Sequence, residues 1–165
     1  MGLVLGTARS WRAMLWRGAR VIVVCGVLLI GADISVASSA PTPTPPVITE
    51  PFTPLPCHHG TTLGLEGCAE GQLLSTDRRV NKEVKLLFTV IPTAHQKQSF
   101  VQVEREWLAF RKADCSTMSA VFEGGTIAPL EYALCEVRDD EARSSDLYSY
   151  FGLLEEGRSD LPAWP

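Results

Sequence analysis

The chain has 165 residues, a formal net charge of −4 at neutral pH, and a composition that is 45% hydrophobic and 21% charged. This length is enough for one domain. The acidic balance argues against a nucleic-acid-binding protein, because contacts with phosphates need clustered Lys and Arg side chains. It favours a partner that carries positive charge.

Residues 1–40 have the order of a secretory signal peptide. Four arginines precede an apolar run, VIVVCGVLLIG, and the small residues SVASSA follow it. The run has about 11 residues, too few to span a bilayer core roughly 30 Å thick. We expect the leader to be removed and the protein to be secreted or periplasmic. The alternative is an uncleaved leader, which would be the protein's one membrane contact. Without residues 1–40 the chain keeps 11 basic and 18 acidic residues, a net charge of −7.

Residues 41–56, PTPTPPVITEPFTPLP, are expected to form a Pro/Thr-rich linker. They hold seven of the eleven prolines in the chain. Proline fixes φ and has no N–H to donate, so this stretch is expected to be extended. It could hold the domain away from a membrane or a cell wall, or be a disordered N-terminus. We place the folded domain at residues 57–155 and a short C-terminal tail at 156–165.

Four cysteines remain after the leader is removed: Cys57, Cys68, Cys115 and Cys135. An even number in a small exported domain predicts two disulfides, for which three pairings are possible. His58 and His59, beside Cys57, raise the alternative of a metal site. Adjacent histidines cannot easily face one ion on regular backbone, and exported thiols tend to oxidise, so we expect no metal and no other cofactor.

Apolar residues at helical spacing predict three helices, at residues 65–90, 94–122 and 126–151. Pro92 should end the first helix, and Thr126 can cap the third. The expected apolar face of the second helix comprises Phe100, Val103, Trp107, Phe110, Met118 and Val121 or Phe122, with Asp114 as a polar interruption. The residues expected to be solvated are Asp77, Arg78, Lys82 and Lys85 on the first helix and Glu136, Asp139, Asp140 and Glu141 on the third.

A glycine turn, Gly124-Gly125, joins the second and third helices. Cys115 lies nine residues before it and Cys135 ten residues after it. In antiparallel helices this near-symmetry puts the two sulfurs at similar heights, which favours their pairing and leaves Cys57 with Cys68. The predicted fold is therefore all-α, an antiparallel bundle of three helices, or four if the first one breaks, stapled by two disulfides.

Residues 57–151 resemble the LprI-type lysozyme inhibitor domain. The resemblance rests on the pattern W-x3-R-x3-C, then G-G-[ST]-I, then C-x7-R-x3-L. These patterns are carried here by Trp107, Arg111, Cys115, Gly124, Gly125, Thr126, Ile127, Cys135, Arg143 and Leu147, with Tyr132 between the last two patterns. Five of these residues are expected to be structural: Trp107, Arg111, Tyr132, Arg143 and Leu147. Trp107 is expected to anchor helix packing and not to contact a ligand.

The resemblance implies an exported protein that binds and inhibits lysozyme. We expect no enzyme, because the histidines His58, His59 and His95 have no recognisable Ser or Cys nucleophile pattern and the cysteines are better explained as disulfides. Lysozyme cleaves its substrate with two carboxyl groups in a cleft, which a protruding loop could block. Gly124 to Ile127 is the candidate loop, because glycine allows close backbone approach and Thr126 offers a hydroxyl. The alternative for this loop is a turn between stapled helices and nothing more. The alternative for the protein is a non-catalytic envelope adaptor.

Overall fold

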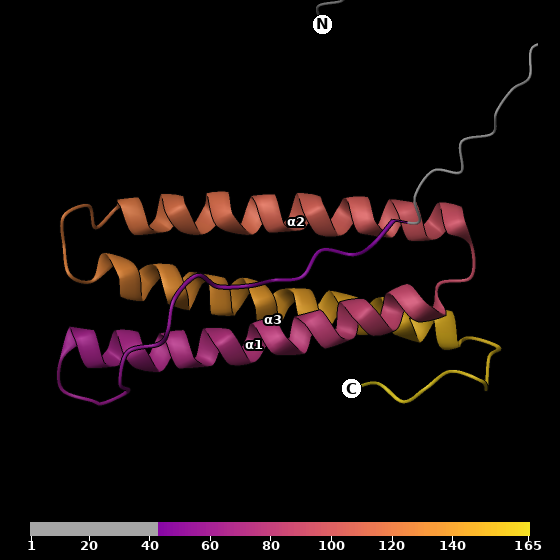
Figure 1. Cartoon of the computed structure of the whole chain (residues 1–165), viewed down its shortest axis with the longest axis horizontal. Coiled ribbons are helices and arrows are strands. Elements are labelled where there is room, and N and C mark those ends of the chain that lie inside the picture. Colours follow the sequence, from indigo (N-terminus) through magenta and orange to yellow (C-terminus); the bar gives the residue numbers. More distant parts are fainter. Residues whose placement is uncertain (1–42) are drawn as a thin grey trace, which may run out of the picture. The chain divides into compact units, whose positions relative to one another are not determined.

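The computed structural model describes residues 43–165, which form three α-helices and no strand. The helices are α1 (Thr62–Val90), α2 (Ala94–Ala120) and α3 (Ala128–Glu155). They lie lengthwise beside one another, and the chain reverses direction at each connection (Figure 1). The predicted all-α class is confirmed for these residues, and α1 runs unbroken. None of the three helices is long and apolar enough to cross a membrane. The predicted signal peptide lies outside the described residues.

Local sequence explains where the helices begin and end. The Thr61 hydroxyl accepts a hydrogen bond from the Gly64 N–H at the start of α1, at 3.1 Å. Thr93 and Gln96 form a reciprocal capping box at the start of α2. Pro92 ends α1, as predicted. The prediction that Thr126 caps α3 is wrong: the cap position is Ile127, which has no side-chain oxygen to accept a hydrogen bond.

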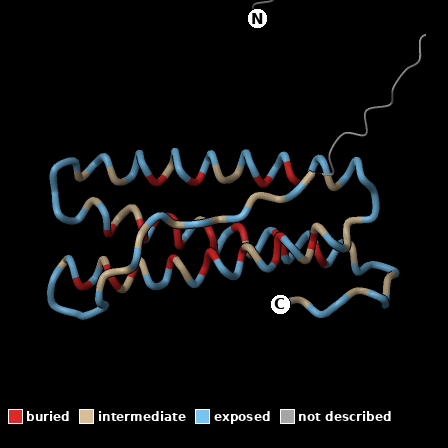
Figure 2. The backbone as a smooth tube through the Cα atoms, in the orientation of Figure 1, coloured by how far each residue is buried: buried red, intermediate tan, exposed pale blue. Residues whose placement is uncertain are grey.

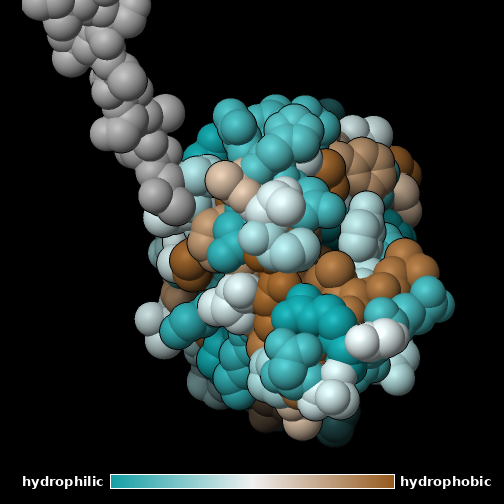
Figure 3. Space-filling view, turned by 90° about the vertical axis from the view of Figure 1, so that its right-hand side faces the viewer, coloured by the Kyte–Doolittle hydropathy of each residue, from teal (hydrophilic) through white to brown (hydrophobic). Residues whose placement is uncertain are grey.

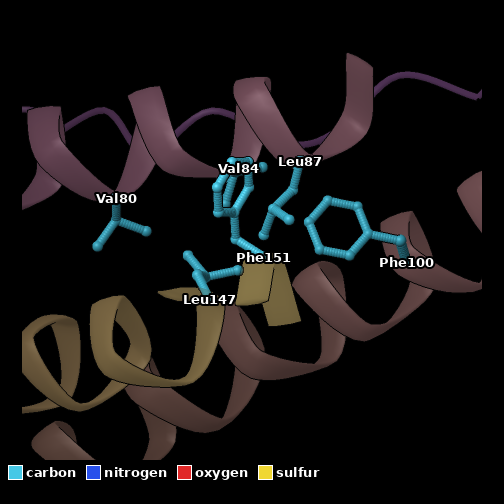
Figure 4. Close-up of a cluster of buried hydrophobic side chains, with 6 residues drawn as sticks. All are labelled: Val80, Val84, Leu87, Phe100, Leu147 and Phe151. Atoms are coloured by element: carbon cyan, nitrogen blue, oxygen red, sulfur yellow. The ribbon is translucent and has the colours of Figure 1, made fainter. Parts of the chain in front are cut away.

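The apolar core consists of two clusters separated along the helices. One cluster comprises Val80, Val84, Leu87, Phe100, Leu147 and Phe151, drawn in Figure 4. The other comprises Ala69, Leu73, Leu130, Ala133 and Val137. Buried polar and charged side chains occupy the positions between them on both α1 and α3. α3 packs against α1 and α2, so it supplies residues to both clusters.

The predicted apolar face of α2 is buried at Phe100 and half-buried at Trp107, but most of it is exposed. Val103, Phe110 and Met118 are 42%, 60% and 41% exposed. The buried residues of this helix are Phe100, Val101, Glu104, Arg111 and Cys115. Figure 2 shows the buried part of α2 in red, on the side that faces the other helices. The helix is rotated this way because its two buried charges and its cysteine each have a partner on α1 or α3.

Part of the expected linker packs against the helices. Residues 43–56 are extended and run across the helical domain (Figure 1). The Ile48 N–H donates to Asn81 Oδ1 at 2.8 Å, and Asn81 Nδ2 donates to the Ile48 carbonyl at 3.0 Å. The Leu55 N–H donates to a carboxylate oxygen of Glu70 at 2.7 Å. The prolines keep the stretch extended, as expected, but side chains of α1 hold it in place.

Both chain segments outside the helices therefore contribute to the fold. The tail after α3 returns along the helical domain, and the Trp164 ring lies 5.0 Å from the ring of Phe151 and 5.7 Å from that of Tyr148. Trp164 thus covers the end of the first apolar cluster. This covering adds apolar burial to a domain whose three helices alone make a modest core.

Candidate functional site

The hairpin formed by α2 and α3 carries the predicted candidate loop. Cys115 on α2 and Cys135 on α3 form a disulfide with a Cα–Cα distance of 5.4 Å. The second disulfide joins Cys57 and Cys68, with a Cα–Cα distance of 4.3 Å. Both pairings are those favoured from the sequence. The first one fixes the two arms of the hairpin below its tip, and the second closes the loop that leads into α1.

The tip of the hairpin is a well-defined turn. Gly124 has φ of +75°, a conformation that side-chain-bearing residues rarely adopt. The Gly125 N–H donates to the Phe122 carbonyl at 2.8 Å, and a Cβ at this position would lie 3.0 Å from the same oxygen. All four loop residues, Gly124 to Ile127, are exposed. The structure thus presents the candidate loop to solvent at the end of a stapled hairpin.

Arg111 is the centre of a buried ionic network. Its guanidinium lies 2.9 Å from Asp77 on α1 and 3.1 Å from Asp140 on α3. Glu136 on α3 and Glu50 in the N-terminal segment each approach it to 3.6 Å. The Thr76 hydroxyl donates to Asp140 at 2.6 Å. One arginine therefore joins α1, α2, α3 and the N-terminal segment.

A second buried pair lies two helical turns from Arg111 along α2. Arg143 on α3 pairs with Glu104 on α2, and both side chains are buried. The Trp107 ring lies close to both arginines, 5.9 Å from the Arg111 guanidinium carbon and 5.7 Å from that of Arg143. Both cations are within cation–π range of the same ring. Arg111 thus lies near the indole and also reaches carboxylates.

Burial raises the pKa values of acidic groups around Arg111. It raises the pKa of Asp77 to about 7, against the opposing attraction of Arg111, and nearby Asp140 and Glu50 raise it further. Burial also raises the pKa of Glu136 and of Asp140. The pKa of Tyr132 rises to about 12, first through burial and then through its hydrogen bond to Glu136. Four carboxyl groups around one guanidinium cannot all be charged without strong repulsion.

The expectation that Asp77, Glu136 and Asp140 are solvated is wrong. Each is at most 4% exposed, whereas Arg78, Lys82, Lys85 and Glu141 are exposed as predicted. The sequence did hold a signal for this. Asp77 is four residues after Leu73 and three before Val80, so it lies on the apolar face of α1. Asp140 is likewise three residues after the buried Val137.

One group of side chains has the density of a metal site. Ligand atoms of Asp114, Cys115, Cys135 and Asp139 all lie within 4.8 Å of one another. The chemistry does not fit a metal, because the two sulfurs are joined in a disulfide and cannot act as thiolates. Arg138 already bridges the two carboxylates, at 3.1 and 3.2 Å. His58 and His59 are exposed and belong to no such group among residues 43–165.

Two of the hollows on the surface of the helical domain border residues of the buried network or the core. One, of about 660 Å³, is bordered by the N-terminal segment and reaches Arg111 and Tyr132. The other is an apolar groove of about 320 Å³ between α1, α2 and α3, lined by Phe100, Val103 and Tyr150 among others. It lies at the end of the domain where α1 passes into α2. Figure 3 views this end, and hydrophobic residues gather there between hydrophilic ones.

A comparison with known protein families agrees with the resemblance that the signature residues carry. The family model described as "Lysozyme inhibitor LprI" matches residues 57–147, more than half of the chain. The chain belongs to the LprI family. No curated protein and no solved structure matches it. The LprI match begins at the first disulfide cysteine and ends at Leu147 in the core, so it spans both disulfides and every helical residue of the ionic network, leaving out Glu50 alone.

The LprI signature residues have structural positions in this chain. Arg111, Arg143 and Leu147 are buried, and Trp107 and Tyr132 are half-buried beside the two arginines. Each signature arginine forms an ion pair that links α2 to another helix. The signature residues of the turn are the ones that stay exposed. In this LprI domain, packing therefore explains why the two arginines belong to the signature. Packing alone does not explain why the turn residues belong to it, because they are exposed.

Proposed function

We propose that this protein is exported and binds and inhibits lysozyme, the glycoside hydrolase that cleaves peptidoglycan. The observation that carries the proposal is the match of the lysozyme inhibitor family over residues 57–147, which include α2, the turn and the disulfide-linked part of α3. The two disulfides fit an oxidising compartment outside the cytoplasm. The leader at residues 1–40, with its signal-peptide pattern, supplies the route.

The hairpin tip, Gly124 to Ile127, is the proposed inhibitory loop. It is exposed, and the Cys115–Cys135 disulfide restrains both arms that carry it. A loop held in one conformation before binding loses less entropy when it enters a cleft. The glycines let the backbone approach closely, and the Thr126 hydroxyl and the backbone N–H groups are donors for the catalytic carboxylates of lysozyme.

The charge around the tip suits a basic lysozyme. Residues 113–137 contain Asp114, Glu123, Glu131 and Glu136 and neither Lys nor Arg. Of these acids, Glu136 is buried in the Arg111 network, and the other three reach the surface. An acidic tip attracts a cationic partner and orients its approach, and salt screens this attraction. We therefore propose that the lysozyme it inhibits is basic.

The test is a cell-wall lysis assay with the purified protein and a basic lysozyme. The protein should slow lysis, and added salt should weaken the effect. A protein that leaves several types of lysozyme fully active would contradict the proposal. That result would favour the alternative of an envelope adaptor that uses the same hairpin for a different partner.

A further inference from the structure

An apolar stripe runs along the exposed side of α2. Val103, Phe110, Met118 and Val121 are 42%, 60%, 41% and 76% exposed. Together with the half-buried Trp107 and Asp114 they repeat at steps of three and four residues, so they lie along one side of the helix. From residue 103 to 121 this stripe, which we call the α2 stripe, is about 27 Å long at 1.5 Å per residue.

The stripe is left outside because other contacts fix the rotation of α2. Glu104, Arg111 and Cys115 each have a partner on α1 or α3 and lie on the inward side of the helix. Turning the stripe inward would bring Phe110 into the core but would remove Arg111 and Glu104 from their ion pairs. It would also break the geometry of the disulfide. The fold therefore keeps a row of large apolar side chains in solvent, where contiguous apolar surface commonly marks an interaction site.

The α2 stripe meets a groove at one end and the protruding hairpin tip at the other. At one end Val103 lines the 320 Å³ groove together with Tyr150 and Leu154. At the other end Val121 precedes the exposed turn that contains Ile127. Groove, stripe and tip thus form one face of the α2–α3 hairpin. Such a face offers a partner a long contact with a pocket at its far end.

Acidic side chains border this face. Glu106 is exposed and stands one turn from both Val103 and Phe110, and Asp114 lies within the stripe itself. On α3, Asp139 contacts Arg138 beside Asp114, and the exposed Asp146 lies 3.9 Å from Arg143 next to Trp107. Arg143 is buried, so the charged groups that reach the surface here are four carboxylates and Arg138, which together carry a charge of −3.

The basic side chains of α2 nearest in sequence point elsewhere. Arg105 and Lys112 each come two residues after a stripe residue, which places them about 200° around the helix from it. Lys112 accordingly borders the other hollow, beside Arg111. The apolar row and its acidic border therefore lie away from Lys112, whereas Arg105 lines a further hollow that Val103 also borders.

We propose that the α2 stripe, with its groove, is the main contact surface for a basic lysozyme, a proposal that rests on the proposed function. A cationic partner complements the acidic border, and its apolar side chains would cover Phe110 and Val121. A second copy of this chain would bring two acidic borders together, and anionic lipid would meet the same repulsion. The tip enters the cleft, and the stripe holds the partner against the hairpin.

The experiment measures the affinity of the purified protein, produced from the full chain, for a basic lysozyme by calorimetry. The double variant Phe110→Ser/Val121→Ser should weaken binding by about tenfold or more, since aromatic residues at the centre of an interface dominate its energy. Leu63→Ser is the matched control, because Leu63 on α1 is as exposed as Phe110, at 60% each. Its affinity should stay at the wild-type value.

Charge variants give a second measurement that does not remove apolar surface. Glu106→Lys should weaken binding and flatten its salt dependence, whereas Glu66→Lys, on α1 three residues from the control position Leu63, should not. Wild-type affinity in the Phe110→Ser/Val121→Ser protein would overturn the assignment of the stripe while leaving lysozyme binding in place. Wild-type protein that binds no lysozyme would overturn both proposals. A wild-type dimer that Phe110→Ser dissociates, or binding to phosphatidylglycerol vesicles, would overturn the choice of partner.

Discussion

The guanidinium of Arg111 on α2 lies 2.9 Å from the carboxylate of Asp77 on α1, and both side chains are buried. This pair lies between the two apolar clusters of the core. α2 is therefore held to the rest of the domain largely by buried charge and a disulfide, and less by apolar packing. That construction explains how the apolar stripe of α2 can remain in solvent, and it leads to the first two predictions.

Replacing Arg111 with methionine should destabilise the protein strongly. The change leaves Asp77, Asp140 and Glu136 without their cation, and removing one partner from a buried ion pair costs about 3–5 kcal/mol. Denaturant unfolding measures the loss. The matched control is Arg138→Ala, because Arg138 also bridges two carboxylates but is 56% exposed. An exposed pair contributes about 1 kcal/mol or less. Equal losses in the two variants would contradict the central role of Arg111.

Stability should fall as the pH rises from acidic to neutral. Burial raises the pKa of Asp77 from 3.8 to about 7, so between these values the folded protein binds a proton that the unfolded chain releases. The free energy of unfolding therefore decreases across this window. The raised pKa of Asp140 acts in the same direction.

Thermal unfolding at the two ends of that window measures the effect. Asp77→Asn, which has no proton to release, should show a smaller decrease than the wild type. Asp114→Asn, at a half-exposed carboxylate outside the Arg111 network, should behave as the wild type does. An unchanged slope in Asp77→Asn would show that this carboxyl group does not hold the extra proton.

Two glycines of α1 should respond to alanine in opposite ways. A Cβ on Gly67 would lie 2.5 Å from the Leu55 carbonyl oxygen and 2.8 Å from that of Pro56, so Gly67→Ala should displace the N-terminal segment and destabilise the fold. Gly71 has nothing within 4 Å, and Gly71→Ala should stabilise α1 by up to about 1 kcal/mol. Thermal unfolding separates them. A stabilising Gly67→Ala would mean that the segment is not packed there.

The Cys115–Cys135 disulfide should stabilise the hairpin. It joins residues 20 positions apart, and closing a loop of that length is worth about 3 kcal/mol on chain entropy. Replacing both cysteines with serine should lower the free energy of unfolding by about this amount.

Mass spectrometry of a non-reduced digest should show Cys115 linked to Cys135 and Cys57 linked to Cys68. Any other linkage would contradict the hairpin geometry.

The hairpin tip can be tested without disturbing the helices. Thr126 is exposed, and its hydroxyl does not cap α3, so Thr126→Arg should leave helix content unchanged. The added positive charge should repel a basic lysozyme and reduce inhibition in the lysis assay. Gly125→Trp should also reduce inhibition, because a bulky side chain prevents close backbone approach. Loss of helix content in both variants would instead support a purely structural turn.

The sequence by itself determined the helices and their staples. Apolar periodicity, Pro92 and the glycine turn placed all three helices within a few residues, because these signals act locally along the chain. The spacing of Cys115 and Cys135 about Gly124-Gly125 favoured the correct disulfide for a geometric reason. The match of Trp107, Arg111 and the turn to a family pattern also needed no coordinates.

The tertiary structure decided which face of each helix is buried. On α2 the apolar repeat predicted one face, but ion pairs to other elements and the disulfide turned a different face inward. These partners are far apart in sequence: Arg111 is separated by 34 residues from Asp77 and by 29 from Asp140. Periodicity describes one helix at a time, so it cannot report a partner on another helix. Long-range charge pairing therefore placed the α2 stripe at the surface, and only the folded chain reveals it.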